Sequence, residues 1–359
     1  MFYRRQRLAS HRVPMLGMVV VLVMAVLGTA TAGAATSTAA ARHVTAVPNI
    51  QRLGEYSGRP VHDAVILGPK GARTLARSAL YGGTYRAASG DLVRVYMSTL
   101  YVPDDSYLQA WANLFGALVH GAELSTLTVE IVTPGELNIL CPEADGCYFP
   151  SSSVLYLSGS GTADGVPVEI VATHEYGHHV ANNRNNSPWT AGDWGTKRWA
   201  SYEDVCAKVD AGLAFPGDEA ANYASNPGEA FAESYMYLNI QRFGLALPPW
   251  LFDPIFMPDY ASLSTIQQDV MSPWTGQKTF VWKGRVTRAR SSTLPTKLDG
   301  NLVFRLVAPA GSTLQIYANG RLAASTHRSF AGTICGARSI VTRIISRRAG
   351  RFTVTAYIP

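Results

Sequence analysis

The stretch PVEIVATHEYGHHVANNR, residues 167–184, contains the pattern His174-Glu175-x-x-His178. If the stretch is helical, four residues advance the chain by about 400° and about 6 Å. The imidazoles of His174 and His178 then lie one above the other on one helix face, as two ligands of one tetrahedral metal ion require. Glu175 follows the first imidazole, so its carboxylate lies where it can take a proton from a metal-bound water. The pattern predicts metal-assisted hydrolysis.

The flanking residues favour a helix. Pro167 stands where a first helical turn tolerates proline, and Ile170, Val171 and Val180 give the run an apolar side. The alternative is a buried helix whose histidines only form hydrogen bonds. We prefer the metal site because the chain has only eight histidines, and two of them flank a glutamate at the required spacing.

The third metal ligand must come from elsewhere, because a catalytic zinc normally has three protein ligands and a water. Metzincins place a glycine and a third histidine after the pair, but Ala181 and Arg184 stand at those positions. Downstream of His179 the only histidine is His327. We therefore expect a carboxylate ligand.

The best candidate lies in Asn226-Pro-Gly-Glu229-Ala-Phe-Ala-Glu233. Asn226 is suited to cap a helix that begins at Pro227. Glu229 and Glu233 are four residues apart and share a face of that helix. We assign Glu229 to the metal, and Glu233 to holding a ligand imidazole or the helix pair in orientation. For a glutamate pair in isolation, a solvated face is the alternative.

Together these residues resemble a known family. His-Glu-Tyr-Gly-His, followed about fifty residues later by Tyr-x-x-Asn-Pro-x-Glu-Ala-Phe-Ala-Glu, resembles the secreted bacterial gluzincin metallopeptidases of the anthrax lethal factor-like type. The resemblance covers roughly residues 90–245. It implies a zincin-like fold, one Zn²⁺ bound by His174, His178 and Glu229, and Glu175 as general base.

The family also uses a tyrosine shortly before the glutamate ligand to stabilise the oxyanion. Tyr223 is the nearest match in this chain, and Tyr202 and Tyr235 are the alternatives. The resemblance therefore adds Tyr223 to the expected catalytic residues.

The residues before the motif fit an α+β fold. We expect strands at 92–101, 127–132 and 154–157, and a helix from Asp104 to about His120. A further helix is expected at about 196–211. This order is expected of a zincin upper lobe, in which 154–157 is the edge strand that pairs with an extended substrate.

The C-terminal residues have a different pattern. Alternating strands are expected at 281–287, 302–307, 314–318, 339–345 and 352–358, separated by turns such as Asn319-Gly320. Short strands at this spacing indicate a small all-β sandwich domain. It resembles the β-sandwich modules that follow the catalytic domains of secreted bacterial peptidases.

The N-terminal residues indicate export. Residues 1–35 have the arginines and the apolar core of a cleaved signal peptide, and an uncleaved signal-anchor is the alternative. Residues 36–90 are a linker, a cap or a short pro-segment. The expected domains are then the zincin-like catalytic domain at 91–276 and the basic β-sandwich at 277–359. No membrane span is expected in the mature chain.

The four cysteines fit two disulfides in an extracellular protein. Cys141 and Cys147 flank a loop short enough to be clipped by one bridge. Cys206 and Cys335 remain as a pair that would tie the last domain to the catalytic one. A metal site at Cys141 and Cys147 lacks partner residues.

Charge is divided unevenly along the chain. Residues 278–359 contain fourteen lysines and arginines and one acid, Asp299, whereas residues 36–277 carry a net charge of −11. This suggests that the sandwich docks on an anionic surface, with cell-wall polymer preferred over nucleic acid and the catalytic domain as a further choice. A generic basic exterior is the alternative.

These observations predict a secreted zinc metalloendopeptidase that hydrolyses protein or peptide substrates through a zinc-bound water activated by Glu175. The alternative is an exported cell-surface or binding protein with a catalytically silent zincin domain. Hydrolysis of a non-peptide bond is a third, smaller choice.

Overall fold

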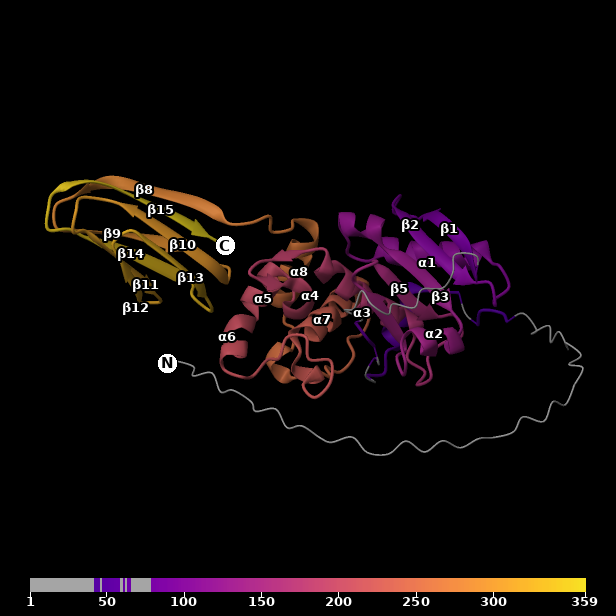
Figure 1. The fold of residues 1–359 in the computed structure, drawn as a ribbon. Helices are drawn as coiled ribbons and strands as arrows, with labels where there is room; N and C mark the ends of the chain where they lie inside the picture. The colour runs from indigo at the N-terminus through magenta and orange to yellow at the C-terminus, as the bar shows by residue number, and fades with distance from the viewer. Residues whose placement is uncertain (1–41, 46, 59–60, 62, 66–78) are drawn as a thin grey trace, which may run out of the picture. The chain divides into compact units, whose positions relative to one another are not determined.

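The computed structural model describes residues 42–45, 47–58, 61, 63–65 and 79–359, so the expected signal segment at 1–35 lies outside the described residues. The described chain is a mixed α+β protein with several sheets, and its C-terminal part is all β (Figure 1). None of the helices in these described ranges is both long and apolar enough to cross a bilayer.

The first sheet has five strands in the order β1-β2-β3-β5-β4. Its strands are β1 (Leu80–Arg86), β2 (Leu92–Ser98), β3 (Thr128–Val132), β4 (Gly146–Phe149) and β5 (Val154–Ser158). The three central strands run parallel, and β1 and β4 are antiparallel to their neighbours. The sheet therefore begins before Asp91, where we expected the domain to start.

The prediction that 154–157 is the edge strand is wrong. β5 lies between β3 and β4, and β4 forms the edge. We did not predict β4 because it is only four residues long and begins at the end of the Cys141–Cys147 loop. The sheet edge beside the HExxH motif thus belongs to Gly146–Phe149.

Of the helices, α1, α2 and α3 contact this sheet, and α3 and α7 carry the motif residues (Figure 1). Asp104 caps α1 by accepting hydrogen bonds from the N–H groups of Ser106 and Tyr107, and α1 ends at Ala117, before the expected His120. The helices are α1 (Asp105–Ala117), α2 (Pro134–Leu140), α3 (Val168–Asn182), α4 (Ala191–Trp194), α5 (Lys197–Tyr202), α6 (Val205–Asp210), α7 (Pro227–Arg242) and α8 (Tyr260–Met271). Short 3-10 helices are η1 (Ile50–Glu55), η3 (Ala122–Thr126), η4 (Tyr223–Ser225) and η5 (Pro254–Phe256).

The single helix expected at 196–211 is in fact two, α5 and α6. The break falls at Asp204, which has a φ of 51° in the left-handed region. A residue in this conformation cannot continue a right-handed helix. A two-stranded hairpin, β6 (Asn185–Asn186) with β7 (Trp189–Thr190), precedes these helices.

The C-terminal part is a pair of four-stranded antiparallel sheets, β13-β10-β15-β8 and β12-β11-β14-β9. Apolar side chains from both sheets, such as Phe304 and Phe352 from one and Ile316 and Ile344 from the other, form one buried core. The strands are β8 (Lys278–Val286), β9 (Ala289–Pro295), β10 (Gly300–Val307), β11 (Thr313–Ala318), β12 (Arg321–Thr326), β13 (Ser329–Ile334), β14 (Ser339–Ile345) and β15 (Gly350–Ile358).

Three sandwich strands, β9, β12 and β13, were not predicted. Each lies at a sheet edge and has mostly exposed or half-buried side chains, so its sequence lacks the apolar alternation of a core strand. The five strands that were predicted are present; Ser339–Ile345 has the predicted bounds, and the other four differ at one or both ends.

Candidate metal centre

Helix α3 presents His174, Glu175 and His178, and all three side chains are buried, with at most 3% of each residue exposed. The helix packs against α7 at Gly177. A Cβ added at Gly177 would lie 2.8 Å from the Cα of Ala232, closer than real Cβ contacts allow. Glycine at this position therefore lets the two helices approach closely enough for their side chains to meet.

Helix α7 brings the acidic side chains. The side chain of Asn226 caps it by accepting a hydrogen bond from the N–H of Gly228, and Pro227 is its first residue. Glu229 lies in the first turn and Glu233 one turn later, each 1% exposed. The local sequence thus places two carboxylates on the side of α7 that faces α3.

The predicted ligand atoms converge. The Nε2 atoms of His174 and His178 are 3.2 Å apart, and each lies 3.3 Å from Oε2 of Glu229. Donors about 2.0–2.1 Å from a tetrahedral zinc lie about 3.3 Å from one another. The spacing among these three side chains is therefore that of three vertices of such a site.

A fourth donor, Asp63, was not predicted. Its Oδ2 lies 3.4 Å from Nε2 of His174 and 3.3 Å from Nε2 of His178. Single donor atoms from Asp63, His174, His178 and Glu229 all lie within 4.8 Å of one another. Two imidazoles and two carboxylates can hold a metal ion. No spacing rule connects one aspartate in the N-terminal segment with a helix more than a hundred residues later, so no sequence signal points to Asp63.

The unpaired atoms around the site also fit a cation. Within the described part of the chain, Oδ2 of Asp63, Oε1 of Glu229 and both carboxylate oxygens of Glu175 are buried without a hydrogen-bond partner. Burial opposes charge on His178, but Glu229 and Asp63 raise its pKa to about 10. A site with this excess of negative charge favours a positive ion among its donors.

Glu233 contacts the other side of a ligand imidazole. Its Oε2 lies 3.2 Å from Nδ1 of His174. A proton on Nδ1 shared with this carboxylate leaves Nε2 free to face the metal donors. Glu233 thus lies where it can fix the orientation of His174.

Glu175 is 0% exposed. Burial, followed by the nearby charge of Asp63, raises the pKa of its carboxyl group well above the usual value. None of the described side chains forms a hydrogen bond with its oxygens. Buried carboxylates are normally paired, whereas Glu175 lies next to His174 in sequence with both oxygens unpaired among the described residues.

The three candidate tyrosines lie in different places. The hydroxyl of Tyr223 donates to Oδ1 of Asp63 at 2.5 Å, which puts it next to the fourth donor. The hydroxyl of Tyr202 donates to Asp259 instead, and that of Tyr235 to the carbonyl of Val119. Of these tyrosines, Tyr223 is therefore the one beside the metal donors.

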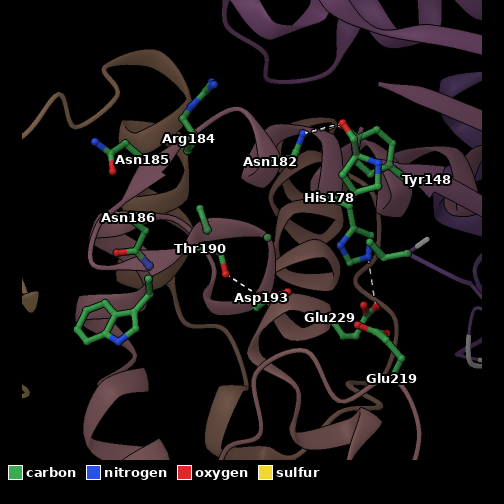
Figure 2. A pocket seen from close by; sticks show the side chains of 15 residues that line it. Tyr148, His178, Asn182, Arg184, Asn185, Asn186, Thr190, Asp193, Glu219 and Glu229 are labelled. Carbon is green, nitrogen blue, oxygen red and sulfur yellow. Dashed lines mark hydrogen bonds and ion pairs between the residues drawn. The ribbon is translucent and has the colours of Figure 1, made fainter. Parts of the chain in front are cut away.

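Two cavities flank the donors. A cavity of about 290 Å³ is lined by His178 and Glu229 at one end and by the hairpin and α4 at the other. Figure 2 shows His178, Glu229 and Glu219 grouped together, with Asn186 farther away. A second cavity of about 220 Å³ lies beside His174 and Tyr223, with apolar side chains from the segment after α7 in its wall.

Both expected disulfides are present. Cys141 is bonded to Cys147, and Cys206 to Cys335. The second bridge joins α6 to the loop before β14, so it ties the sandwich to the helical region. Because their sulfurs are bonded to each other, Cys206 and Cys335 are not available as metal ligands beside Asp210.

The comparisons with known proteins do not identify the chain. No family model matches it, and neither does any curated protein. A periplasmic inhibitor of g-type lysozyme from Aeromonas hydrophila, PliG, aligns with 23% of this chain and 89% of its own, at 12% identity and a TM-score of 0.22. The protein FLHE aligns with 23% of this chain and 98% of its own, at 12% identity and a TM-score of 0.15. Scores this low support no inference about fold or function.

Proposed function

We propose that the protein is an exported zinc-dependent metalloendopeptidase with a zincin-like domain of the gluzincin type. His174, His178 and Glu229 hold one Zn²⁺, and Glu175 is the general base. The observation that carries the proposal is the set of three donor atoms 3.2–3.3 Å apart beside an unpaired buried carboxylate. The resemblance of the two motifs to the lethal factor-like peptidases supports the same assignment.

The donor types favour zinc. Two imidazole nitrogens and a carboxylate oxygen form a ligand set of catalytic zinc, whereas calcium and magnesium prefer oxygen ligands only. Zinc would supply Lewis acidity at the scissile carbonyl and would lower the pKa of water near it.

The protein's own residues then have separate tasks. Glu175 takes a proton from the attacking water and delivers it to the leaving amine nitrogen. Tyr223 donates a hydrogen bond to the carbonyl oxygen as negative charge develops on it. Glu233 holds the ring of His174 in place through Nδ1.

The edge strand β4 supports a protein or peptide substrate. An extended chain that pairs with Gly146–Phe149 would run past His178, because β4 packs against α3. Export is supported by the two disulfides, which persist in oxidising compartments.

The test compares the wild-type protein with Glu175→Gln. We expect the variant to keep one equivalent of zinc by metal analysis and to lose at least 1000-fold in the hydrolysis rate of a peptide library. Glu203→Gln is the matched control, because Glu203 is also a buried glutamate but pairs with Lys208 away from the metal donors. Undiminished cleavage by Glu175→Gln would remove Glu175 from the reaction.

One observation favours a second candidate function. With Asp63, the protein supplies four donors, and a site closed by four protein ligands is typical of structural zinc. The protein would then be an exported binding protein whose zincin domain is catalytically silent. The unpaired carboxylate of Glu175, which such a site does not need, favours the peptidase.

A further inference from the structure

Val61 and Asp63–Val65, which precede the first sheet in sequence, lie at the candidate metal centre. The carbonyl of Ala64 accepts a hydrogen bond from the N–H of Tyr148 at 3.2 Å, and Val65 forms a parallel bridge with Tyr148. Tyr148 belongs to β4, the edge where an extended substrate would pair. The segment therefore occupies the place that the proposed function gives to substrate.

Residues of this stretch also border the cavities on both sides of the metal donors. Val61 lines the cavity beside His174, and Val65 lines the cavity beside His178. Asp63 lies between them with its side chain directed at both imidazoles. A peptide substrate would place its scissile bond where Asp63 now lies.

The carboxylate of Asp63 is engaged by both of its oxygens. Oδ2 completes the donor set, and Oδ1 accepts the hydroxyl of Tyr223. A catalytic zinc needs its fourth position open, and the expected oxyanion donor needs a free hydroxyl. Asp63 occupies the fourth position and also engages the hydroxyl of Tyr223.

Residues that precede Val61 in sequence are anchored to the α+β region. Leu53 and Tyr56 are buried in the core of the α+β region. The N–H of Asn49 donates to Glu169 of α3, and Arg52 lies 3.5 Å from the same carboxylate. Because these anchors belong to the same chain, they keep Asp63 at a high effective concentration next to the metal donors.

We propose that Val61 and Asp63–Val65 are a built-in inhibitor, with Asp63 as a fourth metal ligand that keeps the cleft closed until this stretch moves away. The proposal rests on the proposed function and adds its regulation. It also assigns the edge of β4 as the substrate-binding strand, since the inhibitor pairs with it. Point variants suit its test better than truncation, because removing the segment would expose the apolar core that Leu53 and Tyr56 cover.

The test uses the full chain loaded with Co²⁺ and the small bidentate metal ligand acetohydroxamate as a probe. We compare the wild type with Asp63→Ala, with Asp63→Asn, and with Glu55→Ala as control, because Glu55 is an exposed carboxylate of the same segment. Titration is followed by the visible absorption of Co²⁺, and peptide hydrolysis is measured in parallel. Thermal melts followed by circular dichroism check that each variant is folded.

We expect Asp63→Ala to bind acetohydroxamate at least tenfold more tightly than the wild type and Glu55→Ala, with Asp63→Asn in between, and to hydrolyse peptides at least tenfold faster. Equal binding by all four proteins would overturn the inhibitor. Equal binding together with peptide hydrolysis by the wild type would overturn the inhibitor and support the peptidase. Tighter binding by Asp63→Ala without any hydrolysis would support the inhibitor and overturn the peptidase. Failure of every protein to bind Co²⁺ would overturn both.

Discussion

At the scale of single residues, the candidate site depends on Gly177, which has no side chain, as well as on its ligands. Gly177 stands between His174 and His178 in sequence, and a Cβ at this position would lie 2.8 Å from the Cα of Ala232 on α7. The close approach of the two helices sets the spacing between the imidazoles and Glu229. A larger residue at Gly177 would therefore act on metal binding without touching a ligand.

We predict that Gly177→Ala lowers zinc affinity at least tenfold and destabilises the fold by about 1–3 kcal/mol, since the new methyl group would overlap Ala232. Zinc affinity is measured by competition with a chelator, and stability by urea denaturation. Gly135→Ala in α2 is the control, because nothing lies within 4 Å of the place that its methyl group would take. We expect Gly135→Ala to keep zinc affinity and to be neutral or slightly stabilising. Unchanged zinc affinity in Gly177→Ala would contradict the spacing role.

A second residue, Lys197, predicts how stability depends on pH. Its side chain is 1% exposed, and its Nζ donates to the carbonyl of Ser187 and lies 4.6 Å from the ring centre of Trp274. Burial lowers the pKa of Lys197 from 10.5 to about 8, although Asp299 and Asp269 oppose the shift. Between pH 8 and 10.5 the unfolded chain therefore holds a proton that the folded chain has released.

The free energy of unfolding should consequently rise with pH across this window. We predict that the wild type gains about 2 kcal/mol relative to Lys197→Met between pH 7 and pH 9.5. Urea denaturation of both proteins at the two pH values measures the difference, and other titrating groups cancel in it. A gap that stays constant with pH would show that Lys197 titrates normally.

The sequence predicted part of the site for a definite reason. His174, His178 and Glu229 lie on regular helices, where fixed spacing converts directly into a shared face. Asp63 comes from an irregular segment, so its position depends on tertiary contacts such as the bond between Ala64 and Tyr148. Spacing rules do not describe such contacts.

At the scale of elements, the same distinction separates correct from wrong predictions. Helix α7 was located by its asparagine cap and first-turn proline, which are local signals. The break between α5 and α6 depends on the backbone of Asp204, whose side chain forms an ion pair with Arg338 of the distant sandwich. The edge position of β4 depends on strand order, which a four-residue strand cannot encode locally.

At the scale of the whole molecule, the two disulfides close loops of very different length. Cys141 and Cys147 are separated by 6 residues, and Cys206 and Cys335 by 129. In the chain-entropy description, the longer loop restricts the unfolded chain more strongly. The bridge to the sandwich should therefore contribute more to stability.

We predict that Cys206→Ser with Cys335→Ser lowers the free energy of unfolding by about 5 kcal/mol, and Cys141→Ser with Cys147→Ser by about 2.5 kcal/mol. Urea denaturation of the two double variants under identical conditions gives both values. An equal or larger loss from the short loop would mean that native contacts around Cys141, rather than chain entropy, determine the order.

The charged side chains on the surface of the sandwich are all positive. Its fourteen lysines and arginines are all exposed, whereas its single acid, Asp299, is buried and paired with Arg338. To the surrounding solvent this part of the chain is a polycation without acidic side chains. Its attraction to any polyanion would be long-ranged and would not depend on a particular orientation. Added salt would screen this attraction and dissociate the complex.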